Sequence, residues 1–145
     1  MTATETAAEL AARLDRALAE AEALARAMPD ERVGATVPGR ARTLGGLAFH
    51  VFRASLAFAD AMDTGGLPRE WLTDQPPEDL ADGPAIGRYG ALVRGRLAGW
   101  FEGAGAGEYG RTIDTCRGRA TGLELLAHTV AHAERHLGEL RRQCA

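Results

Sequence analysis

The sequence contains no lysine and no asparagine, so all 17 of its basic residues are arginine. We attribute this whole-chain bias to genomic composition rather than to function. Acidic residues outnumber basic residues by 20 to 17, which gives a net charge of −3. A chain with this balance lacks the strongly basic surface that marks proteins that bind DNA or RNA.

Long apolar runs are also absent, and no segment approaches the roughly 18 apolar residues that a membrane-spanning helix needs. Residues 1–5 lack the basic and apolar regions of a signal peptide. The only two cysteines are Cys116 and Cys144. A disulfide between them has no support in the sequence, and two free thiols in a reducing compartment explain them more simply. We therefore expect a cytoplasmic protein that does not bind membranes.

What the sequence has in quantity is alanine, the residue with the highest helix propensity. Its 145 residues are enough for one domain with a hydrophobic core, so we expect a single domain over residues 1–145. Apolar residues recur at three- and four-residue spacing in four segments, as on the buried face of a helix. These segments are 10–28, 44–62, 84–101 and 122–142.

Local signals mark where these helices begin. Thr6 with Glu9, and Thr121 with Glu124, have the spacing of a capping box, and Thr43 is placed to cap the second helix. The connection over 63–84 is rich in proline and is expected to wrap the bundle, with at most a short turn of helix. The glycine-rich connection over 103–120 excludes a stable helix, and weak alternation over 109–116 favours a short hairpin. The fold class predicted is all-α: a four-helix bundle with long second and third connections.

The four histidines are distributed unevenly, because three of them lie on the last helical segment. His128, His132 and His136 are spaced at i, i+4 and i+8, so neighbours lie roughly 6 Å apart along one helix face. His128 and His136 are roughly 12 Å apart along the axis, whereas nitrogens around one metal ion lie only about 3 Å apart. One adjacent pair can therefore bind a metal, and spacing alone allows either His128–His132 or His132–His136.

The fourth histidine, His50, borders the apolar stripe of the second helix. It can supply a third ligand to the pair on the last helix. Three protein ligands that leave a position for water or substrate are the pattern of a catalytic site, whereas structural zinc sites are closed by four. Imidazole ligands suit zinc, nickel, iron or copper. Zinc is the metal we expect first, with nickel or iron as alternatives.

Two segments resemble the DinB-like family. RTLGGLAFHVFR at 42–53 is similar to the second helix of that family, and LLAHTVAHAERHL at 125–137 is similar to its last helix. The shorter pieces LPREWL at 67–72 and RYG at 88–90 also resemble one subgroup. The resemblance implies a four-helix bundle that binds a divalent metal through three histidines, which correspond here to His50, His132 and His136. His128 departs from the family pattern, because relatives tend to have a polar residue there that is not a ligand.

This family includes mycothiol-dependent maleylpyruvate isomerases and bacillithiol S-transferases, so the resemblance implies metal-dependent chemistry with a low-molecular-weight thiol. In such a reaction a metal ion would favour the thiolate, which attacks an electrophilic small molecule. The same site can instead activate water.

The candidate catalytic residues are His128, Arg53 and Tyr89. His128 is interpreted as a group beside the metal, as an acid or base of the pocket, or as a solvated residue. Arg53 and Arg94 are candidates for pairing with a carboxylate of the thiol or substrate, although surface charge also explains them. Tyr89 and Trp71 are explained as readily by packing. Glu134, between two ligands in the sequence, is expected to point away into solvent.

Several functional alternatives stay open at this stage. The first is a metal-dependent hydrolase or isomerase on the same scaffold. Another is a non-enzymatic, metal-binding stress-response bundle, and a weaker one is a protein that captures electrophiles with Cys116. The expected partners are a small-molecule substrate and a second copy of the chain in a homodimer, the commonest oligomer.

Overall fold

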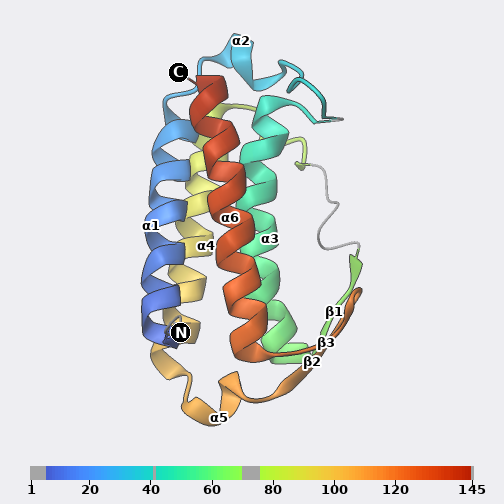
Figure 1. Ribbon diagram of the computed structural model, residues 1–145. Helices are drawn as coiled ribbons and strands as arrows, with labels where there is room; N and C mark the ends of the chain where they lie inside the picture. The colour runs from blue at the N-terminus through green and yellow to red at the C-terminus, as the bar shows by residue number, and fades with distance from the viewer. Residues whose placement is uncertain (1–5, 41, 70–75, 145) are drawn as a thin grey trace.

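The computed structural model describes residues 6–40, 42–69 and 76–144. Residues 1–5, in which no signal peptide is expected, and the expected loop residue Trp71 lie outside the described residues. Within the described part, four long helices pack as a bundle (Figure 1). They are α1 (Ala7–Arg26), α3 (Leu44–Thr64), α4 (Gly83–Gly103) and α6 (Gly122–Cys144). The predicted all-α four-helix bundle is confirmed.

Each long helix packs against two others. Helix α1 contacts α4 and α6, and α3 contacts the same two helices, so α1 and α3 face each other across the bundle. Helices α3 and α4 run in the same direction, and so the connection between them must return along the length of the bundle (Figure 1). This explains why the second connection is long. None of the helices in the described ranges is both long and apolar enough to cross a lipid bilayer.

The predicted helix starts are confirmed by hydrogen bonds. The Thr6 and Thr43 hydroxyls accept from the backbone N–H groups of Glu9 at 3.1 Å and Gly46 at 3.0 Å. At the start of α6, the Thr121 hydroxyl accepts from the N–H of Glu124 at 3.1 Å, and the Glu124 carboxylate accepts from the N–H of Thr121 at 2.9 Å. These bonds satisfy amide groups that have no partner within the helix.

The predicted apolar stripes form the core. Leu14 and Leu18 of α1, and Leu47, Val51 and Phe58 of α3, are at most 1% exposed. Nearly all of α3 is buried, including its small residues, because α4 and α6 flank it and a strand covers part of it. The one polar ring on this buried helix is His50.

The connections contain more structure than the sequence predicts. Short helices, α2 (Asp30–Val33) and α5 (Ala106–Tyr109), lie in the first and third connections. The expected hairpin exists but lies a few residues later than 109–116, as β2 (Thr112–Thr115) and β3 (Gly118–Thr121).

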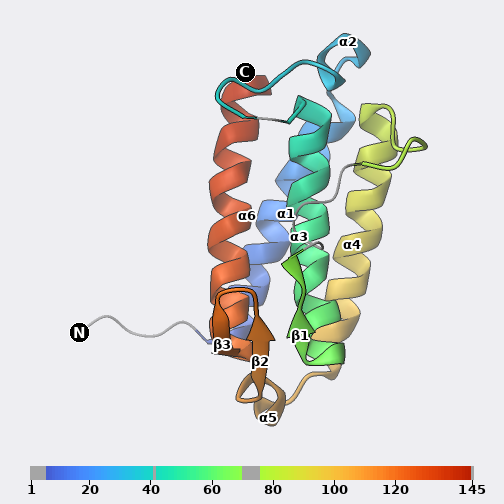
Figure 2. The ribbon, with the colours of Figure 1, turned by 90° about the vertical axis from the view of Figure 1, so that its right-hand side faces the viewer.

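A third strand, β1 (Gly66–Leu67), pairs in parallel with β2 and was not predicted. The strand order is β1-β2-β3, with Gly66 opposite Asp114 and Thr112 opposite Thr121. Figure 2 shows this small sheet in front of α3 and α6, near the end of the bundle that carries α5. The sheet thereby joins the second and third connections on the face that α3 and α6 share.

The packing of α4 against α3 depends on a glycine. A Cβ atom on Gly90 would lie 2.6 Å from Cζ of the buried Phe52 ring, whereas a Cβ on Gly95 would meet nothing within 4 Å.

Both glycines lie inside α4, so alanine gives the same gain in helix propensity at each. Overpacking a core costs about 1–3 kcal/mol. We expect Gly90→Ala to be less stable than Gly95→Ala by about that amount in urea unfolding followed by circular dichroism. Equal stability of the two variants would contradict this close approach.

Candidate metal centre

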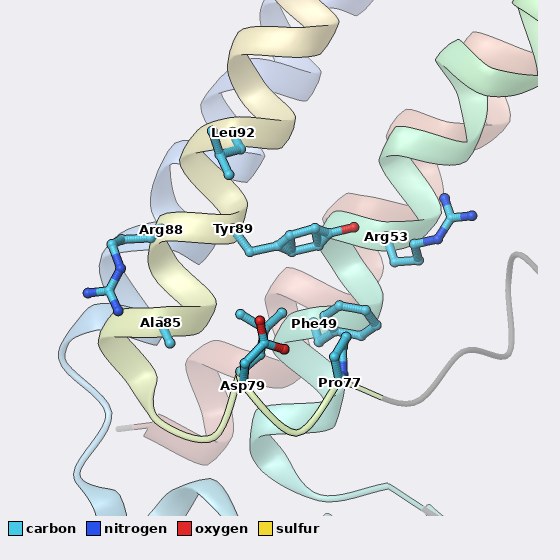
Figure 3. A pocket seen from close by; sticks show the side chains of 9 residues that line it. Phe49, Arg53, Pro77, Asp79, Ala85, Arg88, Tyr89 and Leu92 are labelled. Carbon is cyan, nitrogen blue, oxygen red and sulfur yellow. The ribbon is translucent and has the colours of Figure 1, made fainter.

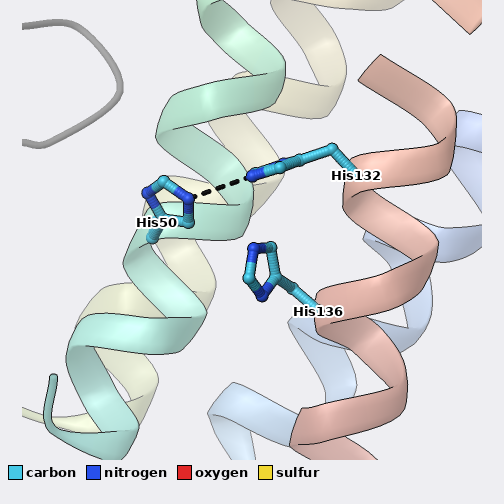
Figure 4. Close-up of side chains that lie close together, drawn as sticks. All are labelled: His50, His132 and His136. Carbon is cyan, nitrogen blue, oxygen red and sulfur yellow. Dashed lines mark hydrogen bonds between the residues drawn. The ribbon is translucent and has the colours of Figure 1, made fainter. Parts of the chain in front are cut away.

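Three histidines from two helices meet on the face that α3 and α6 share. His50 lies in the second turn of α3, and its side chain is 5% exposed. His132 and His136 lie one turn apart on α6, and His136 is 2% exposed while His132 is half-buried. The three rings point toward one another (Figure 4). The structure thus brings together the three residues that the sequence proposes as ligands.

The distances between the rings suit a shared ligand. Nε2 of His50 lies 3.1 Å from Nε2 of His132. One ring nitrogen from each of the three histidines can be chosen so that all lie within 4.8 Å of one another. A tetrahedral shell with bonds of about 2 Å places neighbouring ligand atoms about 3.3 Å apart. The cluster is therefore close to the size of a metal coordination shell.

The surroundings hold these imidazoles in the neutral form. Burial, together with the charges of Arg42 and His136, lowers the pKa of His50 to about 3. Burial and the neighbouring His136 and His50 lower the pKa of His132 to about 3. Burial also lowers the pKa of His136, although Glu139 opposes this shift. A metal ligand must be a neutral imidazole, so all three are in the ligating form near neutral pH.

Glu139 orients one ring and was missed by the sequence analysis. Its Oε1 lies 2.9 Å from Nδ1 of His136 and 2.8 Å from the Arg40 guanidinium. A carboxylate that accepts from Nδ1–H fixes the tautomer and leaves Nε2 as the ligating atom. The signal was present in the sequence, because a residue three positions after a helical histidine lies on the same face.

The three histidines line a cavity of about 590 Å³. Its wall also contains residues of the β2–β3 hairpin and of the connection before α3, so the small sheet of Figure 2 forms one side of it. Apolar side chains of Ala54, Phe58 and Leu125 line part of the wall. This volume suits a small molecule.

The donor set fits a divalent transition metal. Within the described ranges, the group that could hold an ion consists of His50, His132 and His136. No cysteine or carboxylate of these ranges belongs to the group as a fourth ligand. His50 and His132 form hydrogen bonds only with each other among the described residues. Neutral imidazole nitrogens are common ligands of zinc, nickel, iron and copper ions. A metal ion held by three protein ligands would keep positions free for water or substrate, and the three histidines line the cavity.

His128 lies in the same cavity but outside the cluster. It is exposed and lines the wall one turn before His132. Of the two histidine pairs that spacing allows, the structure therefore groups His132 with His136. The His136 ring is buried with its centroid 5.2 Å from that of His50, whereas His128 is exposed. The catalytic role expected for His128 stays a prediction.

The structure does not bring Arg53 and Tyr89 to the histidines. Both line a separate hollow of about 720 Å³ between α3 and α4 (Figure 3). The Tyr89 ring stacks on Phe49 with centroids 5.1 Å apart, and the Arg53 guanidinium lies 3.5 Å from the Asp60 carboxylate. The catalytic roles expected for Arg53 and Tyr89 stay predictions, and the hollow that these two residues line is not the cavity that His50 lines.

Other charged residues are placed differently from the expectation. Arg94 pairs with Asp15 at 2.9 Å and with Glu22 at 3.1 Å, so it ties α4 to α1 instead of facing the cavity. Glu134 points away from the ligands as expected, but it is not simply solvated, since Nε of Arg13 donates to it at 3.2 Å. These pairs satisfy their charges within the bundle.

The cysteines are free thiols, as expected. Cys116 is exposed in the turn of the β2–β3 hairpin and lines the same cavity as the histidines. Cys144 lies at the end of α6, and burial raises the pKa of its thiol. Neither residue belongs to the metal-binding group.

The fold and the three-histidine cluster define a helical bundle with a group of ligands that could hold a metal ion. The chain belongs to the DinB superfamily, whose family model matches residues 13–140. A solved structure of a DinB-like protein from Bacillus subtilis is similar over 94% of this chain and 90% of that chain, with a TM-score of 0.74 and 15% identity. At that identity the likeness shows the fold alone. No curated protein matches the chain. The family resemblance seen in the sequence is confirmed.

The geometry predicts which histidine is essential for metal binding. His132→Ala removes one of three ligands and should abolish metal binding by protein purified without a histidine tag. His128→Ala, one turn earlier, removes an exposed ring outside the cluster and should leave about one ion per chain. Metal content measured by mass spectrometry distinguishes the two variants. Equal loss of metal in both would mean that the wrong pair was identified.

The position of Glu139 gives a second prediction. Glu139→Gln removes the carboxylate that fixes the His136 ring, so metal affinity should fall by about 10- to 100-fold, as for other residues that orient metal ligands. Glu134→Gln is the matched control, because Glu134 lies on the same helix but pairs with Arg13. Competition with a chelating dye measures both affinities. An unchanged affinity in Glu139→Gln would show that the His136 ring is positioned by packing alone.

Proposed function

We propose that this protein is a metal-dependent enzyme that adds or transfers a low-molecular-weight thiol, of the mycothiol kind, to an electrophilic small molecule. The observation that carries the proposal is the meeting of three neutral imidazoles from α3 and α6 beside a cavity large enough for a small molecule. Three ligands leave room for a reacting group. The membership of the chain in the DinB superfamily supports a metal-binding role.

A divalent ion held by His50, His132 and His136 would supply a positive charge that favours the thiolate form of a thiol in the cavity. The thiol proton passes to solvent or to His128, which lies exposed on the cavity wall. The sulfur then forms a bond to the electrophilic carbon. A leaving group departs with the electron pair of the bond that breaks, or, in an addition to an activated double bond, the neighbouring carbon takes up a proton.

The cavity wall supports this chemistry in two ways. The helices hold the ligands, so the first coordination shell is rigid and aimed at the cavity. The apolar side chains of Ala54, Phe58 and Leu125 reduce the water around the reacting sulfur. Hydrolysis on the same scaffold would use water in place of the thiol, and it is the main competing function. A purely structural metal is less consistent with a three-ligand group.

We also propose that the substrate is a small molecule that binds in the cavity beside the histidines. The homodimer expected from the sequence stays a prediction, supported by the frequency of two-fold symmetric assemblies. Zinc is the proposed metal, because three imidazoles with an open position are a common zinc arrangement.

The test combines the zinc-loaded protein with a sugar-linked cysteine thiol and an activated alkyl halide. We expect formation of the thioether to exceed the uncatalysed rate by about 100-fold or more, because a fixed positive charge contributes several kcal/mol. The rate should fall to background in the metal-free protein and in His132→Ala. Mass spectrometry of the thioether product measures this rate.

A panel of simple esters and amides is tested in parallel. Zinc-dependent hydrolysis of the panel without thioether formation would replace the proposal with a hydrolase. A protein that binds zinc but accelerates neither reaction would indicate a non-enzymatic bundle, and it too would overturn the proposal.

A further inference from the structure

The cavity beside the histidines has a charge opposite to that of the chain. The chain is acidic overall, with a net charge of −3. The described residues that line the cavity nevertheless include one carboxylate, Glu124, against six arginines. These are Arg40, Arg42, Arg69, Arg117, Arg119 and Arg135, here called the arginine collar. Glu124 already accepts a hydrogen bond from the backbone of Thr121 at the start of α6.

The collar is assembled from segments far apart in the chain. Arg40 and Arg42 come from the connection before α3, Arg69 follows β1, Arg117 and Arg119 belong to the β2–β3 hairpin, and Arg135 lies on α6. Ordinary surface arginines are solvated or paired, and their presence alone has no functional meaning. The collar is different because only the fold gathers these side chains around one concave site.

The collar is only partly balanced by carboxylates, one of which, Glu139, also attracts the Arg42 guanidinium. Arg40 pairs with Glu139 at 2.8 Å, and Arg119 pairs with Asp114 at 3.1 Å. No ion pair within the described part of the chain involves the other members: Arg42, Arg69, Arg117 and Arg135. Elsewhere in the bundle, long-range pairs such as Arg13–Glu134, Arg94–Asp15 and Arg96–Asp63 neutralise arginines. The cavity thus gathers four arginines that form no ion pair among the described residues, opposite a single lining carboxylate.

The charge of the collar reaches the histidines. Arg42 is half-buried, and burial and the nearby Arg40 lower the pKa of its guanidinium. Arg42, Arg135 and Arg40 all contribute to the lowered pKa of His50. A divalent ion at the histidines would add to this positive potential. An anionic group entering the cavity would be attracted by both, and the attraction is strong because the site is partly removed from water.

We propose that the cavity binds a small molecule with at least two oxyanion groups, which Arg42 and Arg135 of the collar hold while its reactive atom faces the histidine cluster. This inference rests on the proposed function, since the molecule would be the electrophile or the thiol of that reaction. Guanidinium groups bind carboxylates and phosphates with two parallel hydrogen bonds, so both kinds of oxyanion are included. The cavity volume of about 590 Å³ fits a small molecule and not a macromolecule.

The test is calorimetric binding of succinate, inorganic phosphate and succinamide to the protein at constant ionic strength, with and without zinc. Succinate carries two carboxylates, and succinamide is its neutral isostere. We expect succinate to bind and succinamide to bind at least about tenfold more weakly, because charge-assisted hydrogen bonds are lost. Comparing succinate with phosphate shows which oxyanion the collar prefers.

Variants then show whether the collar is responsible. The double change Arg42→Gln and Arg135→Gln should weaken succinate binding by about tenfold or more, both with and without zinc. Arg42→Lys keeps the charge but loses the planar two-point contact, so it should show an intermediate loss. The matched control is Arg88→Gln, which removes an exposed arginine of the other hollow and should leave the affinity unchanged. Thermal melts confirm that each variant is folded.

The outcomes separate this inference from the proposed function. Equal succinate affinity in the double variant and the unmodified protein, or equal binding of succinamide, would overturn the inference even if zinc-dependent thioether formation is observed. The inference would also be overturned if succinate binding requires zinc and its affinity is the same in the arginine variants as in the unmodified protein. The metal alone would then hold the anion. Collar-dependent binding to the zinc-free protein would support the inference even if thiol chemistry fails.

Discussion

The packing of α3 against α6 is the interaction on which the rest of this structure depends. Helices α3 and α6 contact each other, and Val51 of α3 and Leu126 of α6 are fully buried in the same hydrophobic core. Close packing of this kind fixes the distance between helix backbones and leaves little freedom to adjust. His50 is therefore held against His132 and His136, and three polar rings are confined where only their neutral forms are stable. A ligand shell is thus built into the hydrophobic interface.

The two sides of the histidine cluster have different physical characters. On the bundle side, the core and the carboxylate of Glu139 fix the rings. On the other side, the hairpin and the connection before α3 contribute arginine side chains to the wall of a cavity. The arginine charges help to lower the pKa of His50 and would attract an anion to the cavity, so the proposed metal and anion sites share one wall. The small β1-β2-β3 sheet matters because it carries part of this wall.

Local interactions explain why the helices were predictable. Thr6, Thr43 and Thr121 satisfy amide groups a few residues away, and the spacing of leucines and alanines decides which face of each helix is buried. The parallel pairing of β1 with β2 was not predictable in the same way. It involves two residues, Gly66 and Leu67, whose partners lie far away in the chain, and so short a strand has no detectable periodicity. The hairpin was located only approximately, because its strands are short and only Ile113 is buried.

The sequence by itself determined four amphipathic helices and a pair of adjacent histidines on one of them, because both follow from the 3.6-residue period of the helix. Helix spacing left the choice between His128 and His136 open, and only the family resemblance favoured His50, His132 and His136, the three that the tertiary structure groups. Tertiary structure alone decided that Arg53 and Tyr89 belong to another hollow. It also decided that Glu139 supports His136 and that six scattered arginines surround the cavity. The physical reason is that the helical period fixes which residues share a face, whereas which faces meet depends on the packing of helices distant in the chain.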